Sequence, residues 1–169
     1  MSHSLLRSIQ AENGAEYDAD DWLERLSQIG CVVEGSNEES IEIEVFPDRP
    51  DLLSHETMAR AARAFLNEDS QQPTIETKDS GITLDVDSSL ESVRPIIMAA
   101  IVRGVNNGNT VDEKDQFIQS LMDHQEKLHL SLGRRRKFSS IGVHDLSTLS
   151  PPFRVVTVPG SHSFVPLAT

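Results

Sequence analysis

The chain has 169 residues, 37% hydrophobic and 25% charged, so it can bury the core of one ordinary domain or two small ones. This composition excludes a disordered or low-complexity protein. The longest apolar run, residues 96–102, is far shorter than the roughly 20 residues that a membrane-spanning helix needs. Residues 1–18 lack the apolar segment of a secretory signal, and Cys31 is the single cysteine. We therefore expect a cytoplasmic protein without membrane contact or internal disulfide.

Charge is distributed unevenly along the chain. Residues 1–93 contain 21 acidic and 6 basic residues, whereas residues 94–169 contain 6 acidic and 9 basic residues. An acidic surface repels the phosphate backbone of nucleic acids, so we expect any RNA contact to lie in the second part. The net charge of −12 fits a salt-adapted host, although a solubilising acidic face explains it equally well.

The first predicted elements are a helix and a hairpin. Residues 1–18 are polar and do not predict a strand. In residues 22–29 the apolar side chains recur with helical spacing, and Gly30 follows as a natural stop. Residues 31–34 and 40–45 carry β-branched side chains around a loop of turn-forming residues, which predicts a β-hairpin. In its second strand one face is apolar, formed by Ile41, Ile43 and Val45.

The segment FPDRPDLLS predicts a rigid turn, because its prolines fix the backbone and Asp48 and Asp51 can accept hydrogen bonds from it. Arg49 lies between two prolines and two aspartates, so we interpret it as a staple that pairs with a carboxylate of the turn. Ser54 is then placed to cap a helix that starts at His55 and carries an apolar stripe.

The second half predicts a sheet and one long helix. The polar residues 67–81 form the best domain boundary, and alternation resumes at residues 82–87. We expect strands at residues 96–102, 138–146 and 153–158. A long helix is expected over residues 112–132, with inward side chains at Phe117, Ile118, Leu121, Leu128 and Leu132.

The predicted fold class is α+β. A small helix–hairpin–helix domain at residues 1–75 is followed by a mixed or antiparallel sheet with one long helix at residues 81–169. The second part is expected to be an incomplete domain.

Most chemical sites are poorly supported. His124 and His129 are five residues apart, which does not place two metal ligands on one helix face, so no metal site is predicted. His144 lies beside Asp145, but adjacent strand residues point to opposite faces and no serine lies in a nucleophile elbow. No residue is assigned a catalytic role.

The best site candidate is the end of the long helix. The candidate residues are Gln125, Arg134, Arg135, Arg136 and Lys137. Cations are favoured at any helix C-terminus, so this cluster has a purely structural interpretation. The functional alternative is contact with phosphate groups or an RNA end, where arginine and lysine position the backbone and a glutamine amide reads a polar group.

Four segments, in this order, carry a family resemblance: EVFPDRPDLLSHETMARAARAFL, VRPIIMAAIVRGV, HQEKLHLSLGRRRKFSSIGVHDLSTLSPPF and FVPL. Each resembles the matching stretch of phenylalanyl-tRNA synthetase β subunits of the archaeal and eukaryotic type. The resemblance covers residues 30–167 and implies an N-terminal domain followed by the beginning of the editing domain. Thr57, where the family tends to have glycine, is a departure from that pattern.

The resemblance also implies a molecular context. In the family the aminoacylation site lies in the α subunit, so this chain would be a partner in an α2β2 enzyme that uses ATP and Mg²⁺, neither of which this chain is expected to bind. Gln125 and Arg136 match residues of the family's editing pocket, and residues 125–137 are the expected tRNA contact. Other pocket residues are expected beyond residue 169, so the chain alone is expected not to be catalytic.

Two other functions remain open at this point. The chain could be a diverged stand-alone binding module for a protein or an amino acid, which would be monomeric, stable alone and indifferent to tRNA. It could also be a trans-acting hydrolase of mischarged tRNA, which tyrosyl-tRNA deacylation would reveal.

Overall fold

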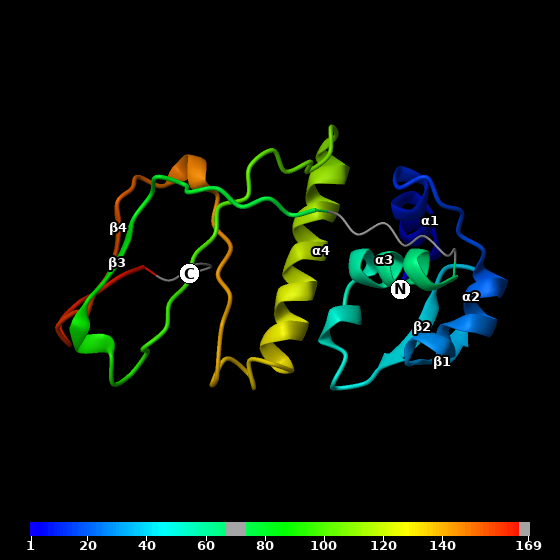
Figure 1. The fold of residues 1–169 in the computed structure, drawn as a ribbon, viewed down its shortest axis with the longest axis horizontal. Coiled ribbons are helices and arrows are strands. Elements are labelled where there is room, and N and C mark those ends of the chain that lie inside the picture. The colour runs from blue at the N-terminus through cyan, green and yellow to red at the C-terminus, as the bar shows by residue number, and fades with distance from the viewer. Residues whose placement is uncertain (67–73, 166–169) are drawn as a thin grey trace. The chain divides into compact units, whose positions relative to one another are not determined.

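A computed structural model describes residues 1–66 and 74–165 (Figure 1). Two compact units are present, one formed by Met1–Thr74 and Asn106–Gly142, the other by Ile75–Val105 and Val143–Thr169. The chain first leaves the first unit after Thr74, within the polar residues 67–81. The long helix, however, is part of the first unit, because the chain returns there at Asn106.

The first unit begins with a helix that the sequence pattern did not predict. Helix α1 spans His3–Glu12, and the Ser2 side chain caps it by accepting a hydrogen bond from the backbone N–H of Leu5. Helix α2 spans Ala19–Arg25 and continues as a 3₁₀ turn, Leu26–Ile29. Gly30 ends this turn at φ 84°, as the stop prediction required.

The predicted hairpin is confirmed. Strands β1 (Cys31–Ser36) and β2 (Ile41–Val45) pair antiparallel, with an irregularity between Val33 and Gly35. The loop is held by Asn37, whose side-chain oxygen accepts hydrogen bonds from the backbone of two following residues. In β2 the glutamates are exposed and the apolar residues face the core.

Helix α3 (His55–Leu66) closes the core of the first unit. Ser54 and Thr57 cap each other's backbone, with Thr57 N donating to Ser54 Oγ at 3.1 Å and Ser54 N donating to Thr57 Oγ1 at 3.2 Å. Thr57, the predicted departure from the family pattern, therefore completes the cap. Helices α1, α2 and α3, the 3₁₀ turns and the hairpin all contribute large, fully buried apolar side chains, which include Leu6, Trp22, Leu26, Ile41, Leu52 and Met58.

The long helix is confirmed as α4, Val111–Leu130. It begins with a capping box in which Thr110 and Glu113 satisfy each other's backbone N–H groups. Two of its predicted inward residues are wrong, because Ile118 and Leu132 are more than half exposed. The buried residue of α4 is His129.

The second unit holds strands β3 (Leu84–Val86) and β4 (Phe153–Val155), which pair in parallel, whereas a mixed or antiparallel sheet was predicted. The strands predicted at residues 96–102 and 138–146 are wrong. Within residues 74–165, neither segment pairs with another strand, so neither has a hydrogen-bonding ladder. The α+β class is confirmed.

Candidate functional site

The predicted basic cluster forms a tight turn at the end of α4. We call residues 131–138 the arginine turn. Its backbone folds back on the helix, with Gly133 N donating to Leu128 O and Phe138 N donating to Gly133 O. Arg134, Arg135 and Arg136 all have left-handed backbone angles, with φ of 47°, 57° and 62°. This conformation costs roughly 1–2 kcal/mol for each non-glycine residue, so other contacts must offset it.

Gly133 is the residue that allows the arginine turn to form. A Cβ atom at this position would lie 2.6 Å from Ser139 O and 2.7 Å from His129 O. Both atoms belong to the backbone and cannot move aside without opening the turn. The position therefore requires glycine for reasons of space.

A polar cluster of three side chains holds the arginine turn against α4. His129 is 3% exposed, and its Nδ1 lies 3.1 Å from Arg136 Nε and 3.3 Å from Glu126 Oε1. The guanidinium of Arg136 also donates directly to the Glu126 carboxylate. On the other side of the ring, Nε2 lies 2.8 Å from Ile141 N and 3.1 Å from Ile141 O.

The other candidate residues differ in their surroundings. Arg134 places its guanidinium 5.5 Å from the centroid of the Phe138 ring, a cation–π contact, while Arg135 and Lys137 are exposed. Gln125 is half-buried, and its Oε1 has no hydrogen-bond donor among the described residues. The arginine turn thus brings the four cations together, but no hydrogen bond in the described part of the chain joins Gln125 to them.

Helix α4 is tied to the start of α3 by two polar contacts. Lys127 Nζ donates to Leu53 O at 2.9 Å, and Ser120 Oγ donates to Glu56 Oε1 at 2.6 Å. The exposed ammonium group of Lys127 therefore also serves a structural contact.

The predicted turn around Arg49 is a staple. Arg49 pairs with Asp51 through two hydrogen bonds of 3.0 and 2.8 Å and reaches Ile29 O at 2.7 Å. The hydrogen bonds from Arg49 hold the pKa of the Asp51 carboxyl below its ordinary value. Asp48 is exposed, and its charge is among the causes that raise the pKa of Arg49. The geometry supports the structural interpretation of this turn.

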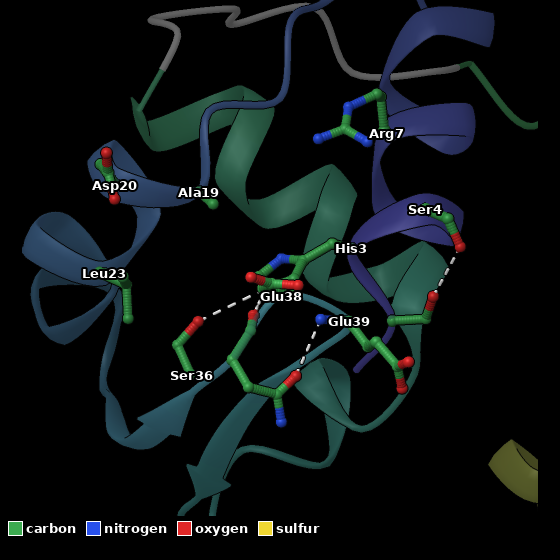
Figure 2. Close-up of a pocket in the computed structure, with 11 residues that line it drawn as sticks. His3, Ser4, Arg7, Ala19, Asp20, Leu23, Ser36, Glu38 and Glu39 are labelled. Carbon is green, nitrogen blue, oxygen red and sulfur yellow. Dashed lines mark hydrogen bonds between the residues drawn. The ribbon is translucent and has the colours of Figure 1, made fainter.

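A hollow that the sequence did not predict lies beside α1 (Figure 2). Its volume is about 850 Å³, and its floor includes His3, whose ring nitrogens contact Tyr17 OH at 2.5 Å and Asn37 O at 2.9 Å. Asp20, Glu38 and Glu39 line it. Because both nitrogens of His3 already have partners, we interpret this histidine as structural. The sequence feature that could have predicted α1, and with it this hollow, is Ser2, which caps the helix.

Two further observations concern other classes of site. Within residues 1–66 and 74–165, no group of three or more His, Cys, Asp or Glu side chains is arranged to hold a metal ion. The described helices include none that is long and apolar enough to cross a membrane.

Comparison with known proteins identifies the family. No family model matches the chain. The chain is 42% identical over 156 residues to the phenylalanine–tRNA ligase β subunit of Methanococcoides burtonii, and 44% identical over 150 residues to that of Methanosarcina barkeri. A crystal structure of an N-terminal fragment of the phenylalanyl-tRNA synthetase β subunit from Pyrococcus horikoshii matches 91% of this chain and 43% of that one, with a TM-score of 0.74 and 27% identity. The chain is a relative of the N-terminal part of the archaeal-type phenylalanyl-tRNA synthetase β subunit.

The match to the β subunit covers most of this chain but little of each relative. The aligned residues are 92% and 89% of this chain, and 28% and 26% of the Methanococcoides and Methanosarcina β subunits. The comparisons with β subunits assign no site residue, so the roles of Gln125 and Arg136 stay predictions.

Proposed function

We propose that this chain acts as the N-terminal part of a phenylalanyl-tRNA synthetase β subunit and supports the charging of tRNA with phenylalanine. The observation that carries the proposal is the identity of 42% over 92% of the chain, together with the fold match to the Pyrococcus fragment. In this role the acidic first half, residues 1–93, serves as scaffold and partner surface. Its partner is an α subunit, in an α2β2 assembly.

The proposed division of chemistry leaves aminoacylation to the α subunit. ATP and Mg²⁺ would bind there rather than to this chain. We further propose the two domains expected from the resemblance, an N-terminal domain at residues 1–75 and the beginning of the editing domain at residues 81–169.

The tRNA-facing part of this role is assigned to residues 125–137. The arginine turn supports the assignment, because it gathers cations at one end of α4 in a chain that is otherwise acidic. Phosphate contacts of this kind position a nucleic acid without reading its sequence.

Co-expression with the α subunit of the same organism tests the proposal. We expect the two chains to co-purify, and the chain in its complete β-subunit context to support phenylalanyl-tRNA formation. The proposal is overturned if a folded α subunit forms active enzyme with another β chain but does not bind this one.

Editing needs a separate measurement. We propose that this chain alone does not hydrolyse mischarged tRNA, so incubation with tyrosyl-tRNA should give only the spontaneous rate of deacylation. Faster deacylation, abolished by heating the protein, would assign a trans-acting hydrolase instead.

A further inference from the structure

We propose that Glu126, His129 and Arg136 form a clamp that positions the arginine turn for contact with RNA phosphate groups. Arg136 is then a positioning residue, and the cations that contact phosphate are Arg134, Arg135 and Lys137. The inference deepens the proposed tRNA-facing role and rests on it.

The hydrogen bonds of His129 show how the clamp connects three segments. The guanidinium of Arg136 is always a donor, so its Nε–H requires His129 Nδ1 to accept, and Nε2–H then donates to Ile141 O. The other tautomer, in which Nδ1–H donates to Glu126 and Nε2 accepts from Ile141 N, would lose the hydrogen bond from Arg136. Either arrangement ties α4 through this one buried ring to the chain that follows the arginine turn.

The direct contact between Glu126 and Arg136 completes the clamp. Arg136 uses Nε for His129 and an Nη group for the carboxylate, so its planar fork is engaged on two sides. A lysine at this position would keep the charge but could not make both contacts. This geometry assigns Arg136 to holding the turn.

The backbone of the turn explains why a clamp is needed. Three consecutive arginines in the left-handed region do not hold that conformation by themselves. The cluster lies directly behind them, with Arg136 N also donating to His129 O. When the clamp opens, the backbone can relax, and the exposed residues Arg135 and Lys137 lose their fixed positions.

The negative charge of Glu126 distinguishes the clamp from simple electrostatic attraction to RNA. Glu126 is an acid beside a basic surface, so its removal should tighten RNA binding if electrostatic attraction alone matters. The clamp predicts the opposite result for Glu126→Gln, because losing the carboxylate releases Arg136 and the arginine turn. The two interpretations therefore differ in sign.

The experiment measures binding of an unmodified phenylalanine tRNA transcript to the full 169-residue chain at several salt concentrations. We expect Glu126→Gln and Arg136→Lys to weaken binding several-fold and to lower the slope of log affinity against log salt by about one to two. Arg135→Ala should lower the slope by about one, as loss of a phosphate contact does. Asp115→Asn removes an exposed acid at the other end of α4, and should leave binding unchanged or slightly tighter.

Each outcome decides between the interpretations. Binding by Glu126→Gln or Arg136→Lys that equals or exceeds the wild-type affinity overturns the clamp and leaves the proposed function standing. Loss of affinity without a change of slope means a general loss of folded protein, which overturns the positioning role. If the wild-type chain does not bind the transcript, both the proposal that the clamp positions the turn for RNA and the tRNA-facing role are overturned. Co-purification with the α subunit still decides the scaffold role.

Discussion

Gln10 in α1 accepts a hydrogen bond of 2.8 Å from Arg63 in α3, a residue 53 positions away in the sequence. Gln10 is fully buried, and its amide nitrogen also donates to Ala59 O at 3.3 Å. The side chain of Gln10 therefore joins α1 to two groups of α3, the backbone carbonyl of Ala59 and the guanidinium of Arg63. Burial of this amide is favourable only while both contacts exist.

We expect Gln10→Met to lower the free energy of unfolding by about 1–3 kcal/mol. The substitution keeps the length of the side chain but leaves the guanidinium of Arg63 and the carbonyl of Ala59 without Gln10 as a partner. Urea unfolding followed by the fluorescence of the buried Trp22 measures the effect. Gln116→Met makes the same change at an exposed position of α4 and should be close to neutral. Equal effects at the two sites would show that the buried contacts contribute nothing.

The same glutamine explains why α1 was not predicted from the sequence. The buried side of this helix consists of His3, Leu6 and Gln10, so two of its three buried residues are polar. The spacing of apolar residues does not predict a buried face that is mostly polar, because the contacts that bury it are made with residues distant in the sequence. The hairpin and α3 were predictable because their buried faces are apolar and their turn and cap residues are local.

The candidate site was predictable only in part for a similar reason. The charges and the position of the arginine turn follow from the order of residues after α4. No local pattern indicates the left-handed backbone of the turn. The burial of His129 and the contact between Arg136 and Glu126 both depend on that backbone. The strand predicted at residues 96–102 failed because a strand also requires a partner, and apolar composition does not supply one.

Gly133→Ala tests the space available in the arginine turn. We expect a loss of about 1–3 kcal/mol from overpacking, because the new methyl group would meet the backbone oxygens of His129 and Ser139. The damage should be local, so hydrogen exchange at the amide of Phe138, which donates to Gly133 O, should accelerate more than exchange in the hairpin. Unchanged protection of Phe138 would contradict the geometry described for the turn.

Gly30→Ala tests the junction between the 3₁₀ turn and β1. Gly30 has a φ of 84°, and a Cβ atom there would lie 3.1 Å from Arg49 Nη1. We expect a destabilisation of about 1 kcal/mol or more, because the conformation is left-handed and the Arg49 staple must also shift. Gly35→Ala is the matched control, since nothing lies within 4 Å of its added Cβ atom and its φ is not positive. In thermal unfolding, the Tm of Gly30→Ala should lie well below the Tm of both the wild type and the control.

His55 gives the first unit a specific dependence on pH. Burial is the main cause that lowers the pKa of His55 below its ordinary value of about 6.5, and the ammonium of Met1 adds to it. Lys127 lowers this pKa further, whereas Glu56 and Asp123 oppose the shift. The backbone N–H of Ser2 donates to His55 Nε2 at 3.1 Å, a contact that also requires the neutral ring.

The sign follows from the direction of the shift. Below about pH 6.5 the unfolded chain takes up a proton at residue 55 that the folded chain resists. The contribution of His55 to the free energy of unfolding is therefore fully present above this pH and falls as the pH drops through it. The lowered pKa of Glu56 acts in a different window, because its stabilisation is lost only as the pH falls below the ordinary carboxyl value of about 4.3. Urea unfolding of the wild type and of His55→Gln between pH 7.5 and 5, values spanning about the ordinary histidine pKa, separates the two groups. Glutamine keeps an acceptor for Ser2 without a titrating ring, so the variant should lose stability less steeply across this range, and equal slopes for the two proteins would refute the assignment to His55.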